Sequence, residues 1–118
     1  MGIGSPVRGE IWLVDFGGRR GHETYKTRPC VVISIDGLGA LGLKVVVPFT
    51  DWKAHYRKNP WMVKVSPTSA NGLDKDSALD GLQVTCVDET RFTRRLGVLS
   101  AGEMEDAVAS VRFVIDAI

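Results

Sequence analysis

Short runs of apolar residues, many of them β-branched or aromatic, follow one another through the first hundred residues of the chain. Some runs alternate with polar residues and others are continuous, and both patterns at these lengths are typical of β-strands. The strands that we predict span residues 8–16, 28–35, 43–48, 61–65, 79–87 and 94–99. A glycine-rich link at 36–42 suits a hairpin, and 67–76 is expected to form a loop. Pro48 has no N–H for a sheet ladder, so the third strand should end, bulge or lie at an edge there.

The last part of the chain shows a helical pattern instead. Ser100 and Glu103 have the spacing of a capping box, in which each side chain satisfies a backbone N–H at the start of a helix. Apolar residues then recur at helical spacing and are expected to pack on the core: Met104, Ala107, Val108, Val111, Val114, Ile115 and Ile118. The whole pattern predicts a single domain over residues 1–118, mainly β with a C-terminal helix, arranged as a small barrel or a strongly bent sheet.

Composition narrows the class of protein. The chain is 44% hydrophobic and 25% charged, as in ordinary globular proteins. It has neither an apolar run of membrane-spanning length nor the features of a signal peptide, so we expect a cytoplasmic protein without a membrane partner. Cys30 and Cys86 both lie in apolar strand patterns and are interpreted as buried thiols in a reducing compartment; a single disulfide between them is the alternative.

The net charge of +1 conceals an uneven distribution. Residues 1–59 carry nine Lys and Arg against five Asp and Glu, whereas residues 60–118 carry six against nine. Basic groups gather at 19–28, 53–58 and 91–95. They are either solvated loops or a local basic face that attracts a short anionic ligand. Such a face is too weak for a protein that coats nucleic acid indiscriminately.

Arg28 stands between a polar, glycine-containing loop and a strongly apolar strand. A guanidinium is rarely buried unless it is paired, and its fork of N–H donors suits phosphate. On local grounds alone, an anion-binding arginine and an ordinary rim arginine are equally good interpretations.

Metal and thiol chemistry find little support in the sequence. The two histidines and two cysteines lack the paired spacing of zinc sites, and the acidic residues form no evident cation cluster. A metal-free site that cleaves RNA needs charge stabilisation at the phosphate and a second donor. Arg28 suits the first role, and Thr50, two residues after Pro48, suits the second. The alternative for Thr50 is simple strand termination.

Aromatic residues alternate with the second basic group. Trp52 and Tyr56 are the better candidates for stacking on the bases of single-stranded RNA. Trp12 and Trp61 are expected to belong to the core.

The order of short motifs along the chain resembles that of the MazF/PemK-type toxin endoribonucleases. The matching segments are Arg8-Gly9-Glu10-Ile11-Trp12-Leu13-Val14-Asp15-Phe16, Gly21-His22-Glu23, Thr27-Arg28-Pro29-Cys30-Val31-Val32-Ile33-Ser34, Val46-Val47-Pro48-Phe49-Thr50, Gly72-Leu73, Ser77, Gln83, Asp88-Glu89-Thr90-Arg91-Phe92 and Gly97. Each motif is weak alone, but their succession is specific and covers nearly the whole chain.

This resemblance implies an SH3-like barrel of the CcdB/MazF type, acting as a homodimer. It implies metal-independent cleavage of single-stranded RNA without a cofactor, leaving 2′,3′-cyclic phosphate and 5′-hydroxyl ends, and an antitoxin partner with a disordered tail. Arg28 falls on the family's catalytic arginine and Thr50 on its catalytic threonine, and the loop at 17–21 matches a mobile loop that gates the site. The substrate contacts that we expect are His22, Lys26, Thr27, Asp51, Trp52, Ser77, Asp80 and Gln83.

One departure from the family pattern affects the chemistry. Leu82 stands directly before Gln83, where many relatives carry an acid. On an alternating strand Asp80 and Leu82 share a face, so Asp80 could replace that acid. Without an acid at 82, however, Arg28 is the main candidate for the proton transfer. Two other functions remain open here: a non-enzymatic gyrase poison resembling CcdB, and a binding module that has kept the fold and lost activity.

Overall fold

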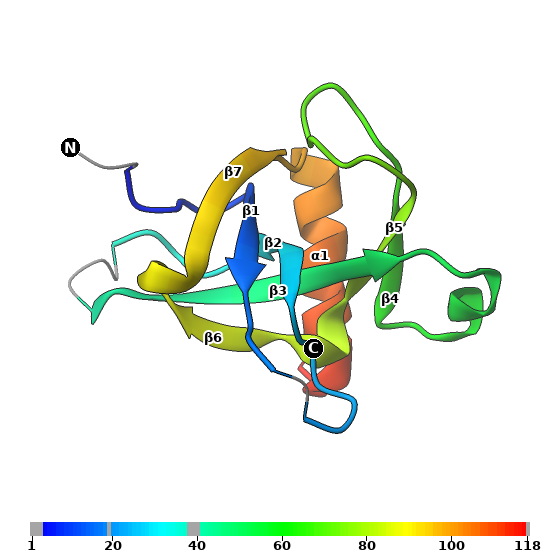
Figure 1. Ribbon diagram of the computed structural model, residues 1–118. Helices are drawn as coiled ribbons and strands as arrows, with labels where there is room; N and C mark the ends of the chain where they lie inside the picture. Colours follow the sequence, from blue (N-terminus) through cyan, green and yellow to red (C-terminus); the bar gives the residue numbers. More distant parts are fainter. Residues whose placement is uncertain (1–3, 19, 38–40, 118) are drawn as a thin grey trace.

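The structure is a computed structural model that describes residues 4–18, 20–37 and 41–117. In this part of the chain seven strands form an antiparallel sheet, and one α-helix follows them (Figure 1). The strands are β1 (Glu10–Asp15), β2 (Thr27–Val32), β3 (Leu43–Asp51), β4 (Met62–Val65), β5 (Ser77–Asp80), β6 (Thr85–Asp88) and β7 (Phe92–Val98), and the helix is α1 (Ala101–Val114). Their order in the sheet is β4-β5-β3-β2-β1-β7, with β6 also paired to β3. The expectation of a mainly β fold with a C-terminal helix is confirmed.

The long strand predicted at 79–87 is wrong, because a 3-10 turn divides it. β5 ends at Asp80, η3 spans Gly81–Gln83, and β6 starts at Thr85. At Gly81 the chain passes so close to α1 that a Cβ would lie 1.9 Å from Ser110 Oγ. The Gly81 N–H and the Ser110 hydroxyl both donate to the Trp61 carbonyl, at 3.0 and 2.6 Å. These contacts hold the turn against the helix.

Pro48 lies within β3, which continues past it to Asp51. β5 pairs with β3 at Phe49–Asp51, and β6 pairs with it at Leu43–Val46. The η3 turn therefore interrupts the partner strand opposite Pro48. A residue without an N–H is tolerated at such a local edge, so β3 can run on as the longest strand of the sheet.

The two faces of the sheet carry separate apolar clusters. The larger cluster lies under α1, which stands behind β3 in Figure 1, and includes Ile11, Val31, Val47, Phe49, Leu79, Leu99, Met104 and Ala107. The smaller cluster lies on the other face and consists of Trp12, Val14, Cys30, Val32, Val46 and Val87, with Phe16 and Phe92 against it. Alternation along β2 and β3 explains the division, since successive side chains point to opposite faces.

The predicted capping box is present at the start of α1. Ser100 Oγ accepts from the Glu103 N–H at 3.1 Å, and Glu103 Oε1 accepts from the Ser100 N–H at 2.9 Å. Met104 and Ala107 of the predicted apolar stripe are buried, and Val108, Val111 and Val114 are half-buried. Ile115 is exposed because the helix ends before it. Ile118 lies outside the described residues.

Two further burial expectations need correction. Trp12 is buried as expected, but Trp61 is only half-buried and stacks on the exposed Phe113 of α1. Both cysteines are free thiols; Cys30 is buried, but Cys86 is exposed because its side of β6 faces away from either cluster. No helix in the described part of the chain is long and apolar enough to span a membrane.

Candidate active site

The register between β2 and β3 brings the two residues of the predicted catalytic pair together. Cys30 lies opposite Pro48, and Val32 lies opposite Val46. Continuing this antiparallel register by two residues places Arg28 opposite Thr50, and residues opposite each other share a face of the sheet. Arg28 and Thr50 are both half-buried at the open end of this face.

Two hollows meet at this pair. Their linings share three residues, Arg28, Phe49 and Thr50. The first hollow, of about 220 Å³, lies between β1, β7 and the loop that precedes β5. The second, of about 170 Å³, lies between the loop that precedes β2 and the β5–η3 turn. Arg28 and Thr50 therefore form a saddle that both hollows reach.

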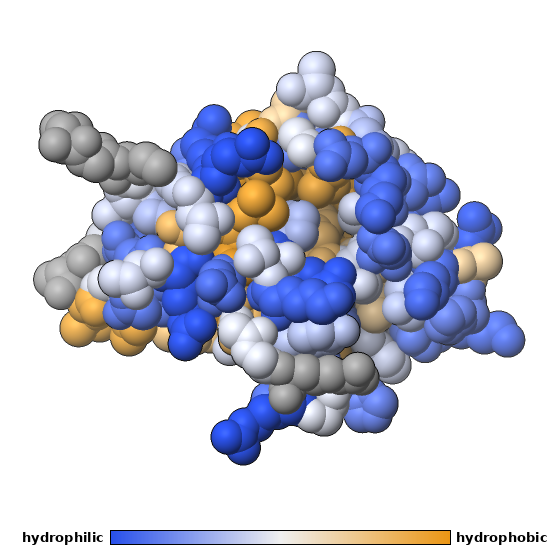
Figure 2. All heavy atoms as spheres, in the orientation of Figure 1, coloured by the Kyte–Doolittle hydropathy of each residue, from blue (hydrophilic) through white to orange (hydrophobic). Residues whose placement is uncertain are grey.

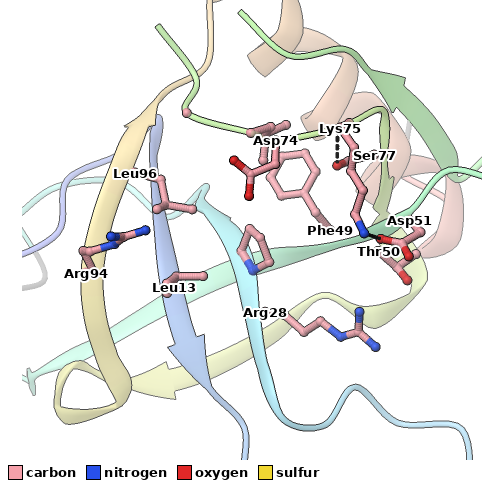
Figure 3. A pocket seen from close by; sticks show the side chains of 13 residues that line it. Leu13, Arg28, Phe49, Thr50, Asp51, Asp74, Lys75, Ser77, Arg94 and Leu96 are labelled. Atoms are coloured by element: carbon pink, nitrogen blue, oxygen red, sulfur yellow. Dashed lines mark hydrogen bonds and ion pairs between the residues drawn. The ribbon is translucent and has the colours of Figure 1, made fainter. Parts of the chain in front are cut away.

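The first hollow combines an apolar floor with charged walls (Figure 3). Leu13, Phe49 and Leu96 supply the floor, and Figure 2 shows this apolar depression ringed by hydrophilic side chains. Lys75 Nζ and Asp51 Oδ1 form an ion pair of 3.1 Å on one wall. Flat, partly apolar groups with polar edges suit such a lining.

The second hollow is bounded by a loop that Gln83 holds. Gln83 Oε1 accepts from the Thr24 N–H at 3.2 Å, and Gln83 Nε2 donates to the His22 carbonyl at 2.7 Å. His22 lines this hollow beside Gln83. Both polar atoms of the Gln83 amide are therefore engaged with the loop backbone, so this predicted substrate contact also positions the loop.

We expect Gln83→Met to loosen this loop without unfolding the protein, because methionine keeps the length of the side chain and removes both hydrogen bonds. Losing hydrogen bonds worth about 1 kcal/mol each should speed exchange of the Thr24 amide about fivefold or more. Native-state hydrogen exchange measures this. Gln83→Glu keeps the acceptor for the Thr24 N–H, so its Thr24 exchange rate should lie between those of the parent and the methionine variant. An unchanged exchange rate at Thr24 in the methionine variant would mean that the Gln83 hydrogen bonds do not hold the loop.

Asp80 lies on the same face as Arg28 and Thr50. Phe49 pairs with Leu79, so Asp80 is opposite Pro48, and its side chain lines the second hollow with Arg28 and Thr50. Asp80 Oδ1 accepts from the Leu82 N–H at 3.1 Å. Burial raises the pKa of Asp80 above its ordinary value, although hydrogen bonds from the Leu82 and Gln83 backbone oppose the shift. Leu82 lies on η3 and is exposed, so the predicted strand face shared by Asp80 and Leu82 is wrong.

Asp88 is a natural comparison for Asp80, because the pKa values of the two carboxyl groups are shifted in opposite directions. Each carboxylate caps a 3-10 turn, but the pKa of Asp88 is lowered, chiefly by hydrogen bonds from Thr90. Folded Asp80 keeps its proton at a pH where the unfolded chain has lost it, so its contribution to stability falls as pH rises through the raised pKa. For Asp88 the contribution is present above its unfolded pKa and is lost as pH falls through the lowered folded pKa.

We therefore expect opposite pH trends for Asp80→Asn and Asp88→Asn, since asparagine keeps either cap. Relative to the parent, Asp80→Asn should gain stability as pH rises from about 4 to 7, and Asp88→Asn should lose it as pH rises from about 3 to 5. Urea denaturation across this range gives both free energies of unfolding. Trends of the same sign in the two variants would contradict the opposite pKa shifts of Asp80 and Asp88.

An aromatic and basic cluster extends the face beyond Thr50. The Trp52 and Tyr56 rings meet edge to face with centroids 5.9 Å apart, and Lys64 Nζ lies 5.7 Å from the Trp52 ring centre. Tyr56 lines the second hollow, whereas Trp52 lies outside both hollows and is half-buried. The His55 ring packs on the Tyr56 ring, with centroids 4.7 Å apart.

The remaining predicted contacts are less directly placed. Lys26 and Thr27 line neither hollow. Lys26 adopts a φ of 65°, and its backbone closes the loop by hydrogen bonds with Phe16 and Gly17. Ser77 is buried in the first hollow and donates to the Lys75 carbonyl at 3.0 Å. Gly17 and Gly21 of the expected gating loop have positive φ, and Arg19 lies outside the described residues.

Tyr25, Asp74 and Arg94 are among the residues of the hollows that sequence reasoning missed. Tyr25 lies beneath Arg28, whose guanidinium carbon is 5.9 Å from the ring centre. Asp74 and Arg94 line the first hollow from opposite sides (Figure 3). An aromatic residue three positions before Arg28 could have indicated a ring that packs against the guanidinium. Nothing in the sequence indicates that residues 74 and 94 line the same hollow. Among the described residues, no three His, Cys, Asp or Glu side chains are grouped to hold a metal ion.

The chain is similar to known proteins over most of its length. The family model described as PemK-like, MazF-like toxin of type II toxin-antitoxin system matches residues 7–115. Endoribonuclease MazF9 of Mycobacterium tuberculosis is 33% identical over 115 residues, which cover 92% of this chain and 95% of the relative.

Among solved structures, MazF from Deinococcus radiodurans has a TM-score of 0.79 at 20% identity, covering 97% of this chain and 99% of that one. An endoribonuclease in complex with its cognate antitoxin, from a mycobacterial species, has a TM-score of 0.73 at 16% identity, covering 98% of each chain. These two likenesses confirm the expected CcdB/MazF fold. With the family match over residues 7–115, they lead to one assignment: this chain belongs to the PemK-like, MazF-like toxins of type II toxin–antitoxin systems.

Proposed function

We propose that this protein is the toxin of a type II toxin–antitoxin pair and acts as an endoribonuclease on single-stranded RNA, without a metal ion or other cofactor. The observation that carries the proposal is the saddle formed by Arg28 and Thr50 between two hollows. The family match and the endoribonuclease relative support the same reaction class.

The proposed chemistry uses the two side chains on opposite oxygens of one phosphate. The Arg28 guanidinium presents several N–H donors and balances the charge that develops on the phosphorus oxygens. The Thr50 hydroxyl donates to a second oxygen. The 2′-oxygen bonds to phosphorus and the bond to the 5′-oxygen breaks. This leaves a 2′,3′-cyclic phosphate, and the 5′-oxygen takes a proton from the solvent to become a 5′-hydroxyl. Asp80, whose raised pKa makes it a stronger base than an exposed carboxylate, is the proposed acceptor of the 2′-hydroxyl proton.

The other predicted contacts divide into three groups around this phosphate. His22 and Gln83 border it in the second hollow, and Asp51 and Ser77 border it in the first. Trp52 is proposed to stack on a base farther along the strand. Lys26 and Thr27 line neither hollow. They are therefore proposed to contact the RNA outside the hollows, from the loop and the strand edge next to Arg28.

The proposed partners are a cognate antitoxin with a disordered tail and a second copy of the chain, in the cytoplasm. The solved relative in complex with its antitoxin supports the first. Exposed apolar side chains support the second: Leu82 on η3, Phe113 on α1 and Ile115 just after it are 54–63% exposed, and large exposed apolar groups are typical of interaction surfaces.

The direct test is incubation of the purified chain, free of antitoxin, with a mixed pool of transcripts in EDTA. We expect discrete fragments from cleavage at a short sequence. Intact RNA after incubation with folded protein would overturn the proposal. Tight RNA binding without cleavage would favour an inactive binding module instead.

A further inference from the structure

Four of the charged side chains that line the first hollow take no part in the proposed cleavage chemistry. Five charged residues line it: Arg28, Asp51, Asp74, Lys75 and Arg94. Asp51 and Lys75 neutralise each other, and Arg28 lies over Tyr25. The Asp74 and Arg94 side chains make no hydrogen bond or ion pair with another residue in the described ranges 4–18, 20–37 and 41–117.

Asp74 and Arg94 face each other across an apolar floor. Figure 3 shows the Asp74 carboxylate entering from the loop before β5 and the Arg94 guanidinium entering from β7. Leu13 and Leu96 lie between them in this view, and Phe49 lies beside Asp74. The Asp74 carboxylate therefore only accepts hydrogen bonds and the Arg94 guanidinium only donates them, at two ends of an apolar surface.

The size and charge of the hollow indicate the part of an RNA chain that fits it. About 220 Å³ is below the range for drug-sized ligands and suits one small ring system. The Asp74 carboxylate repels a second phosphate at its end of the hollow. A nucleobase buries its faces on apolar groups and presents donors and acceptors at its edge.

From this arrangement, and on the basis of the proposed function, we propose that the first hollow binds a guanine next to the scissile phosphate, with Asp74 and Arg94 reading its edge. Guanine presents O6 and N7 as an acceptor pair for arginine. Its N1–H and 2-amino group form a donor pair for a carboxylate. Adenine and cytosine satisfy only part of this arrangement, because neither offers both pairs.

The test selects RNA by binding, so that it does not depend on cleavage. A random-sequence RNA pool with 2′-O-methyl groups cannot undergo 2′-oxygen attack, and the fraction retained by the protein is sequenced. We expect guanine to be enriched at one position with the parent protein and to lose this enrichment with Asp74→Asn and Arg94→Met. Asp76→Asn is the matched control, because Asp76 lies in the same loop but does not line the hollow; it should retain the enrichment.

Base analogues then assign each contact. In one selected RNA, inosine in place of that guanine removes the 2-amino group, and 7-deazaguanine removes N7. For the parent we expect each analogue to bind about fivefold or more weakly. The inosine effect should vanish in Asp74→Asn and the 7-deazaguanine effect in Arg94→Met, as in a double-mutant cycle.

Enrichment of another base, or analogue effects that persist unchanged in both variants, would overturn the guanine pocket. The two proposals fail separately. Guanine-dependent binding by a protein that cleaves no RNA would refute the endoribonuclease and keep the pocket, whereas cleavage without a guanine preference would do the reverse.

Discussion

Arg28→Ala is expected to lower the rate of RNA cleavage by about 10³-fold or more while the protein stays folded. Removing one donor aimed at developing charge typically costs 10² to 10³ in rate, and an arginine that balances phosphoryl charge is worth about 10³ to 10⁵. The fold should tolerate the change because Arg28 is only half-buried and its side-chain contact is with the Tyr25 ring. Single-turnover cleavage of one defined RNA measures the effect, with circular dichroism as the check on folding.

Two further variants separate charge from geometry. Arg28→Lys keeps the charge but loses the planar fork, so it should recover only a small part of the lost rate. Arg112→Ala removes an arginine of α1 that lines neither hollow and should cleave at the parent rate. If Arg28→Ala cleaved as fast as Arg112→Ala, Arg28 would have no catalytic role, whatever the activity of the protein.

The second large effect is on stability, and we expect it from Asn71→Ala. Asn71 is completely buried. Its Oδ1 accepts from the Thr68 and Leu73 N–H groups, both at 3.0 Å, and its Nδ2 donates to the Ser66 carbonyl at 2.9 Å. Alanine leaves three backbone groups without this partner. The expected loss is roughly 3–5 kcal/mol in the free energy of unfolding, since each unsatisfied group costs about 1–3 kcal/mol.

Urea denaturation measures this loss, and Asn59→Ala is the matched control. The Asn59 side chain makes no hydrogen bond with another described residue, so its removal should change stability by less than about 1 kcal/mol. The loop that Asn71 organises carries Asp74 and packs on Gly97, where a Cβ would lie 2.2 Å from the Ala70 carbonyl oxygen. Equal effects of the two asparagine variants would mean that the loop does not depend on these hydrogen bonds.

The strand pattern and the helix start were predictable because they depend on local periodicity and capping chemistry. The break at Gly81 was not, because it results from the close approach of Ser110, about thirty residues away in the sequence. The exposure of Cys86 also depends on which strands β6 lacks as neighbours, and an apolar run alone does not report this.

The candidate site was predictable one residue at a time but not as an arrangement. Arg28 and Thr50 stood out by their chemistry and by the order of motifs, yet their juxtaposition depends on the register of the β2–β3 pair. Gln83 stood out as a substrate contact, whereas its hold on the loop backbone depends on tertiary structure. Asp74 and Arg94 line the same hollow only because the loop before β5 packs against β7.

The function proposed for the Arg28–Thr50 saddle is cleavage of RNA by attack of the 2′-oxygen, without a metal ion. Mass spectrometry of the fragment ends produced in EDTA tests it most directly. We expect a 2′,3′-cyclic phosphate on one fragment and a 5′-hydroxyl on the other, and no such ends with Arg28→Ala. Fragments ending in a 3′-hydroxyl and a 5′-phosphate, or cleavage that EDTA abolishes, would contradict it.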